Sequence, residues 1–284
     1  MIVVTGAGHA LEACDPSPYL LAKKSRKFMG IQDDLAVVGA GRALADAALS
    51  ADALGENAGI YLAVGYIPFQ EEDIAPVLAS SLDEQGRFSM ARFSAGGFQR
   101  AHPLLTFRCL PNMPAYHVSV NFGIRGPYLV VYPGIGAFYL ALEEASAAIA
   151  EGRVEVALLG GVAHQRNFLV EHHFQRIVPP VAPGELRDAG AWLVLESERH
   201  AVERGARIRG RLESVQIAYE PFDPARAMPA FREELDPPHA TAGELGPASL
   251  AAAISLAESH RGALRHAVQS REGIRAESTW SLEP

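Results

Sequence analysis

Two patterns of hydrophobic residues alternate along the chain: continuous apolar runs, which predict strands, and apolar residues spaced three or four apart, which predict helices. Near-continuous apolar runs at 59–65 and Val154–Leu159 are typical of strands covered on both faces of a sheet. Residues 126–139, GPYLVVYPGIGAFY, predict a buried strand, a tight turn and the start of a helix. Apolar residues then recur on one helix face, at Phe138, Leu142, Ala145 and Ile149. Strand, turn, helix and strand within about 35 residues predict a crossover unit of an α/β sheet.

Further elements are predicted on both sides of this unit. A short strand over Ile2–Val4 ends at the glycines of residues 6–8, and Gly160-Gly161 breaks the strand that follows the central helix. Proline-rich residues 221–238 are predicted to be mostly connection. The other predictions are a helix over 33–50, a short strand or helix start over 116–122, a strand over 192–195, a helix end over 200–205, a helix over 247–259 and two final strands joined near 270–273.

Composition indicates a soluble protein of one large domain or two fused halves. The chain has 284 residues, 49% of them hydrophobic, and no apolar run reaches the roughly 20 residues of a membrane span. The first residues lack a basic segment before an apolar one, so we expect a cytoplasmic location. The net charge of −8 argues against nucleic acid or an anionic membrane as partner. The basic run 23–27, KKSRK, is interpreted as a solvated loop, with docking to an acidic protein or a phosphate as the alternative.

Neither a cofactor nor a metal is expected. Residues 6–8, Gly-Ala-Gly, resemble the start of a GxGxxG turn, but the third glycine would fall at Leu11, and CDPSP interrupts the helix that should follow. The ten histidines are scattered. Cys14 and Cys109 are far apart in sequence without metal-like spacing, so both are predicted to be unpaired structural residues.

Several motifs, in order, resemble the β-ketoacyl synthase family. They are VVTGAG at 3–8, KFMGIQDDLAVVGAGRALADAAL at 27–49, PNMPAYHVSVNFGIRGP at 111–127, VEVALLGGVAH at 154–164 and GAWLVLESERHAVERGARIRGRL at 190–212. The resemblance runs from Val3 to about Arg211 and more faintly from about Thr241 to the end. It implies a thiolase-like layered α/β/α/β/α fold with a shortened second half: residues 1–211 as the N-terminal-like half and 212–284 as an abbreviated C-terminal-like half.

The same resemblance implies a condensing enzyme with a cysteine at the start of a buried helix and two histidines from the second half. Its acyl and malonyl groups would arrive on acyl carrier protein. Laying GPYLVVYPGIGAF on the family pattern puts Ile135 at the cysteine position, and a hydrocarbon side chain can neither form a thiolate nor accept an acyl group. The place of one histidine falls on Gly243 or Glu244. The sequence therefore predicts no catalytic residue at these positions.

Other residues are weak substitutes. Tyr132 is interpreted as a packed aromatic in an apolar strand, where a phenol loses its proton less readily. Cys109 lies well before the turn, and His239 follows two prolines in a predicted loop. A decarboxylase role, for which some relatives keep a glutamine at the cysteine position, is disfavoured because Ile135 has no amide.

The resemblance therefore suggests a noncatalytic, chain-length-factor-like subunit that forms a heterodimer with an active ketosynthase and shapes its acyl tunnel in polyketide, polyene or fatty-acid-like synthesis. Acyl carrier protein would be reached through the partner. The alternatives are a homodimeric scaffold that binds an acyl chain or carrier protein without chemistry, an acyltransferase using an unforeseen residue, and a degenerate paralogue. The implied pocket residues are Tyr132, Ile135, Phe138 and Tyr139, and the implied interface residues, by family analogy, are Ser119, Asn121, Phe122 and Arg125.

Overall fold

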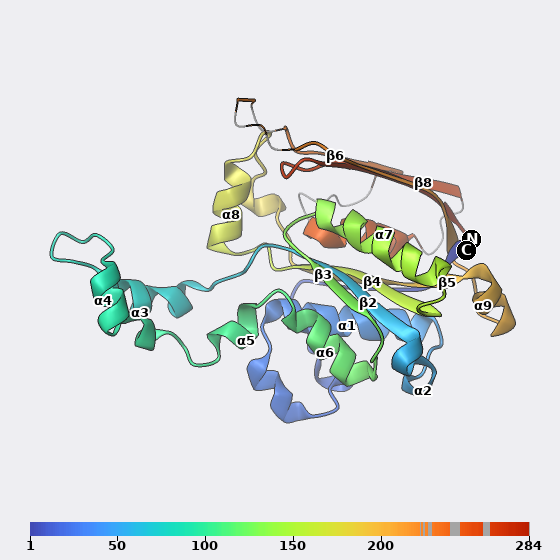
Figure 1. Ribbon diagram of the computed structural model, residues 1–284, viewed down its shortest axis with the longest axis horizontal. Helices are drawn as coiled ribbons and strands as arrows, with labels where there is room; N and C mark the ends of the chain where they lie inside the picture. Colours follow the sequence, from blue (N-terminus) through green and yellow to red (C-terminus); the bar gives the residue numbers. More distant parts are fainter. Residues whose placement is uncertain (222, 224, 227–228, 239–244, 258–261, 284) are drawn as a thin grey trace.

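The computed structural model describes residues 1–221, 223, 225–226, 229–238, 245–257 and 262–283, and these residues form one nine-stranded mixed sheet (Figure 1). The strand order is β3-β2-β4-β5-β1-β6-β9-β8-β7. The strands are β1 (Ile2–Leu11), β2 (Ala58–Val64), β3 (Tyr128–Val131), β4 (Val156–Ala163), β5 (Ala189–Ser197), β6 (Gly210–Tyr219), β7 (Arg232–Asp236), β8 (Gly262–Gln269) and β9 (Ile274–Leu282). β3 and β4 run parallel to β2, whereas the other neighbouring pairs are antiparallel.

The sheet folds over on itself, so that its two parts lie on opposite sides of a helical layer. In Figure 1 the strands β6 and β8 lie above α7 (Gly136–Ala150), and β2, β3 and β4 lie below it. The short helix η6 (Gly246–Ala248) and α11 (Ser249–Leu256) share this inner layer. On the far side of the lower strands lie α1 (Ile31–Asp46) and α6 (Met113–Phe122). The described chain therefore has a layered α/β fold, as predicted.

The outer face of the β6–β9–β8–β7 part is polar. Arg265 of β8 pairs with Glu277 of β9 at 2.7 Å, and Arg275 pairs with Glu220 at 2.9 Å. Side chains on the opposite face of the same strands, including Leu264 and Trp280, are fully buried. Figure 1 shows none of the described helices above this face, and the charge pairs agree with contact to water.

The crossover unit predicted from the central segment is present as β3, α7 and β4. α7 begins one residue after Ile135, and Gly152, with φ of +69°, follows its last turn. Its apolar face packs in the main core against β2 and β4, as the recurrence of Phe138 and Leu142 indicates. The two halves of the sheet are therefore joined through the helix that carries the candidate site.

The prediction that Gly160-Gly161 ends the strand was wrong. β4 continues to Ala163, and both glycines lie within it. A Cβ at Gly160 would overlap the Trp192 ring, and one at Gly161 would overlap the Pro247 carbonyl. These glycines therefore permit close packing on both faces of the sheet and do not mark a turn.

Two other predictions need correction, and a third, the strand or helix start over 116–122, is settled as a helix. β1 extends through the glycines of residues 6–8, because Gly6 and Gly8 allow the backbone of α1 to approach the strand closely. Residues 116–122 belong to the helix α6, with Pro114 near its start and Gly123 at φ +68° after its end. The predicted connection 221–238 contains the strand β7. The final pair of strands, β8 and β9, was predicted correctly.

An arm projects from the body at the left of Figure 1. It comprises α3 (Glu71–Ser81), α4 (Met90–Ala95), η4 (Gly97–Arg100) and the approach to α5 (Leu105–Cys109). The large apolar side chains exposed on it are Leu78, Phe88, Met90, Phe98 and Phe107. Such a group of exposed apolar side chains is typical of a contact surface.

Short elements complete the chain: η1 (Ser17–Tyr19), η2 (Lys23–Phe28), α2 (Ala51–Leu54), η3 (Gly55–Asn57), α8 (Phe168–Gln175), η5 (Pro183–Glu185) and α9 (Glu198–Glu203). The basic run 23–27 forms most of η2, which is a helical turn and not the loop that we expected. In the described part of the chain, no helix has the length and apolar character needed to span a membrane. The expected division between residues 211 and 212 falls inside β6, and it stays a prediction.

Candidate functional site

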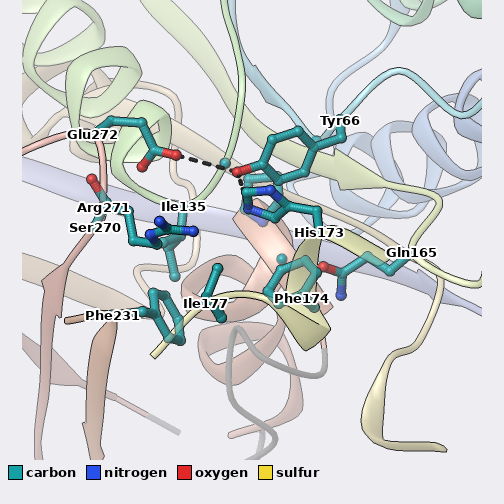
Figure 2. Close-up of a pocket in the computed structure, with 14 residues that line it drawn as sticks. Tyr66, Ile135, Gln165, His173, Phe174, Ile177, Phe231, Ser270, Arg271 and Glu272 are labelled. Carbon is teal, nitrogen blue, oxygen red and sulfur yellow. Dashed lines mark hydrogen bonds between the residues drawn. The ribbon is translucent and has the colours of Figure 1, made fainter. Parts of the chain in front are cut away.

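The turn before α7 opens onto a small cavity. Ile135, which immediately precedes the helix, is 6% exposed and forms part of the cavity wall. The cavity volume is about 40 Å³, enough for water molecules but not for an acyl chain. Figure 2 shows side chains that converge on it from the ends of β2 and β4, from α8 and from the β8–β9 turn, among them Tyr66, Gln165, His173, Phe174 and Glu272.

Three polar side chains form a connected group at the edge of this cavity (Figure 2). The Tyr66 hydroxyl lies 2.7 Å from Nε2 of His173 and donates to Oε1 of Glu272 at 3.2 Å. The Tyr66 and His173 rings also pack together, with centroids 4.3 Å apart. Burial, followed by the negative charge of Glu272, raises the pKa of the Tyr66 phenol, and burial lowers the pKa of His173. At neutral pH, therefore, Tyr66 stays protonated and His173 stays uncharged.

The start of α7 is closely covered by the β8–β9 turn. A Cβ at Gly136 would lie 2.9 Å from Cδ1 of Ile274 and 3.1 Å from Oγ of Ser270. The backbone N–H groups of Ala137 and Phe138 donate to the carbonyls of residues 134 and 135, at 3.2 and 3.0 Å. The local geometry is thus a strand–turn–helix junction that could expose a nucleophile, but the side chain at the turn is a hydrocarbon.

The four predicted pocket residues lie in different surroundings. Only Ile135 lines the cavity, whereas Phe138 and Tyr139 are fully buried in the main core one turn further along α7. Tyr132 was expected to be packed, but it is 48% exposed, because β3 ends at Val131 and Tyr132 belongs to the turn. Ile135, Phe138 and Tyr139 are therefore buried, whereas Tyr132 lies at the surface, and the assignment of these residues to a pocket stays a prediction.

Sequence reasoning missed a buried polar network around Tyr139. Its hydroxyl lies 2.8 Å from Nδ1 of His266 and 3.1 Å from Oγ of Ser278. On the other side of the imidazole, Nε2 of His266 lies 2.8 Å from Oε1 of Glu233, which also accepts from Ser249 Oγ at 2.8 Å. The sequence pattern of β8 could have indicated it, because His266 lies two residues from Leu264 and from Val268 and so shares their inward face.

The residues predicted for the interface make contacts within the chain. Ser119 Oγ donates to the Ile124 carbonyl at 2.7 Å, and Asn121 Nδ2 donates to the His117 carbonyl at 2.8 Å. The Phe122 ring packs against Tyr19, with centroids 6.2 Å apart.

The Arg125 backbone N–H donates to the Gly55 carbonyl at 2.7 Å. Other side chains of the same region are free to meet a partner. Tyr116 and Val120 of α6 are about half exposed, and Tyr128 of β3 is 70% exposed. Because β3 is the first strand in the sheet order, it also presents an edge among the described strands.

Of the remaining candidates, only the two cysteines belong to the described residues, and neither lines this cavity. Gly243, Glu244 and His239 lie outside the described residues. Both cysteines are free, and Cys109 lines a different cavity. Burial raises the pKa of the Cys109 thiol and raises that of Cys14 to about 11, which keeps both thiols protonated. No group of three or more potential metal ligands occurs in the described ranges.

Comparison with known proteins agrees with this architecture. Residues 4–177 match the family model for the β-ketoacyl synthase N-terminal domain. The chain belongs to the β-ketoacyl synthase family. No curated protein matches it.

Three solved structures are similar, and two of them extend the likeness over the whole chain. One is a type II polyketide synthase acyl carrier protein in complex with its ketosynthase bound to the hexaketide (AntDE:AntF), with 15% identity over 99% of this chain and 99% of that chain, and a TM-score of 0.73. A β-ketoacyl synthase from Burkholderia phymatum STM815 gives 14% identity over 100% and 99%, with a TM-score of 0.67. The ishigamide ketosynthase/chain length factor gives 21% identity over 77% and 64%, with a TM-score of 0.57.

At these identities the structures show the fold, and they confirm the ketosynthase-like class predicted from the motifs. The sheet of nine strands and the inner helix layer thus belong to a ketosynthase-like fold. Fold alone does not assign a reaction, so function is argued from the site.

Proposed function

We propose that this protein is a noncatalytic, chain-length-factor-like ketosynthase subunit. It pairs with a cysteine-bearing ketosynthase in polyketide, polyene or fatty-acid-like biosynthesis and helps to shape the acyl tunnel of the pair. The observation that carries this proposal is the buried Ile135 at the start of α7, where the family pattern has its nucleophile.

The chemistry at the cavity supports a noncatalytic role. None of the lining residues is a cysteine. The phenol of the lining residue Tyr66 stays protonated, because burial and the negative charge of Glu272 raise its pKa. Acyl transfer needs a deprotonated nucleophile, which this arrangement disfavours. The cavity of about 40 Å³ is also too small for an acyl chain, so the chain would occupy the partner.

Exposed apolar groups support a protein partner. Tyr116 and Val120 of α6 and Tyr128 of the edge strand β3 are exposed, and the projecting arm carries further exposed apolar side chains. An uncovered edge strand and an apolar surface are both features that soluble proteins usually cover. Pairing would bury them. The likeness to a ketosynthase/chain length factor structure agrees with this type of partner.

The test is a condensation assay with acyl and malonyl groups on acyl carrier protein. The purified chain alone should form no condensation product, while the pair of this chain and its ketosynthase should do so. Condensation by the chain alone would refute the proposal. If the chain instead proves to be a stable homodimer that binds carrier protein without product, the scaffold alternative would replace it.

A further inference from the structure

The cavity at Ile135 has a larger neighbour. This second cavity has a volume of about 180 Å³ and lies near the end of β6 and the start of β9, with Arg226 and Arg275 in its wall. Arg271 and Glu272, in the turn between β8 and β9, line both cavities. These two side chains therefore form the wall that separates the smaller cavity from the larger one.

The backbone of this turn is held in place. The Ser270 N–H donates to the Ile274 carbonyl across the turn, at 2.8 Å. The Glu220 N–H donates to the Gly273 carbonyl at 2.8 Å, and a Cβ at Gly273 would overlap the Glu220 carbonyl. Because these contacts fix the turn to the end of β6, opening the wall requires movement of its two side chains and not of the backbone.

Glu272 is tied to the other side of the cavity edge by Tyr66 (Figure 2). A carboxylate only accepts, so the single hydrogen of the Tyr66 hydroxyl points to Oε1 of Glu272, at 3.2 Å. Nε2 of His173, 2.7 Å from the same hydroxyl, is then the donor of the second bond. The Tyr66 ring packs against the rings of His173 and Phe174, with centroids 4.3 and 6.3 Å away. Tyr66 is therefore fixed by its neighbours, and it holds Glu272 across the edge.

The bond to Glu272 is weak enough to break and reform. Glu272 is exposed, and Tyr66 and His173 are half-buried, so water can replace each partner. The net contribution of such a hydrogen bond shifts an equilibrium by about two- to tenfold. A released Glu272 carboxylate turns into water, where its charge stays solvated. The closed arrangement is therefore favoured by a small factor only.

We propose that Tyr66, His173 and Glu272 form a latch that controls access to position 135. In the closed form Glu272 bonds to Tyr66 and separates the two cavities. In the open form Glu272 turns into water, and the cavity of about 40 Å³ joins the one of about 180 Å³. The joined space admits molecules larger than water. The latch concerns access to position 135, so it does not rest on the proposed subunit function.

The test measures access with a reporter thiol. Ile135→Cys places a thiol at the wall of the smaller cavity, and its rate of alkylation is followed with N-methylmaleimide and with the larger N-phenylmaleimide. Digestion and mass spectrometry separate the reaction at position 135 from the reactions at Cys14 and Cys109. Cys109 lines a different cavity, so its rate reports whether the rest of the chain keeps its structure.

Two variants, each combined with Ile135→Cys, should open the latch. Tyr66→Phe removes the hydroxyl and keeps the ring, so both hydrogen bonds of the hydroxyl are lost. Glu272→Ala removes the carboxylate from the wall. We expect each variant to raise the alkylation rate at position 135 at least about fivefold, with a larger rise for N-phenylmaleimide. Combining the two should add less than about twofold, because both break the same bond.

Arg226→Gln is the matched control, since Arg226 lines the larger cavity but not the smaller one. It should change the rate at position 135 less than about twofold. Unchanged rates in both Tyr66→Phe and Glu272→Ala would overturn the latch. An equal rise for the two maleimides would also overturn it, because altered reactivity of the thiol affects both probes alike.

Circular dichroism checks the fold of each variant. If Tyr66→Phe does not fold, Glu272→Ala, which changes an exposed side chain, decides alone. The condensation assay tests the noncatalytic role separately, so the failure of one proposal does not imply failure of the other.

Discussion

The hydroxyl of Tyr139 lies 2.8 Å from Nδ1 of His266, with both side chains fully buried. Tyr139 belongs to α7, one turn after Ile135, and His266 belongs to β8 in the other part of the sheet. Their rings are nearly parallel, at 7°, and Glu233 of β7 contacts the far side of the imidazole. This network joins the candidate-site helix to the second half of the chain.

Removing the hydroxyl should destabilise the whole protein. Tyr139→Phe leaves polar atoms of His266 and Ser278 without their partner in a buried site, so we expect the free energy of unfolding to fall by about 1–3 kcal/mol. Urea denaturation measures the change. Tyr132→Phe removes the same group from a half-exposed side chain and should change stability by less than about 0.5 kcal/mol. Equal effects of the two substitutions would show that the network contributes nothing.

The side chain at the turn should decide whether the chain can carry an acyl group. We expect the intact mass of the wild-type chain to stay unchanged after incubation with an acyl thioester, because Ile135 cannot accept the group. Ile135→Cys places a smaller, nucleophilic side chain at the start of α7, where the helix dipole favours the thiolate, and should gain one acyl mass. Ile135→Ser is the matched control and should gain none. An adduct on the wild-type chain would reveal an unforeseen nucleophile.

The exposed apolar side chains of α6 and β3 should be needed for pairing with the ketosynthase but not for folding. Val120→Asp and Tyr128→Arg put charges on exposed apolar positions, so we expect the amount of co-purified ketosynthase to fall at least about tenfold. Thermal denaturation should be almost unchanged, because both side chains already face water. Val202→Arg, on the exposed face of α9, is the matched control. Undiminished pairing in both β3-side variants would place the interface elsewhere.

Asp34 should give the protein a distinct dependence of stability on pH. Burial raises the pKa of this carboxyl to about 7 from its ordinary 3.8, although Arg26 partly offsets the effect. Between these two values the folded chain retains a proton that the unfolded chain releases, so the contribution of Asp34 to the free energy of unfolding falls as pH rises.

Asp34→Asn cannot titrate, so the curve of unfolding free energy against pH should lose this decline in the same window. Urea denaturation at several pH values measures it. Asp15→Asn is the control. A hydrogen bond from Ser17 lowers the pKa of the exposed Asp15, so the contribution of Asp15 to the free energy of unfolding changes only below this pH window. Parallel curves for Asp34→Asn and the wild type would contradict the raised pKa.

Local periodicity was sufficient to predict the crossover unit. The spacing of apolar residues located α7, and the apolar runs located β2 and the first part of β4, because those patterns depend on one element and the core that it faces. The identity of the residue at the turn followed from the motif order, and the structure places Ile135 at that turn.

Long-range contacts explain what local patterns did not predict. Gly160 and Gly161 resembled a break because the reason for them, Trp192 and Pro247, lies 32 and 86 residues further along the chain. The Tyr139–His266 contact joins residues 127 positions apart, and no local pattern predicts which buried hydroxyl meets which imidazole.

The most direct test of the noncatalytic role is recovery of the tagged chain from its native host, with the co-purifying proteins identified and their stoichiometry measured. The account predicts an equimolar ketosynthase that retains its active cysteine. Recovery of the chain as a homodimer without such a ketosynthase would contradict the account and favour the scaffold alternative.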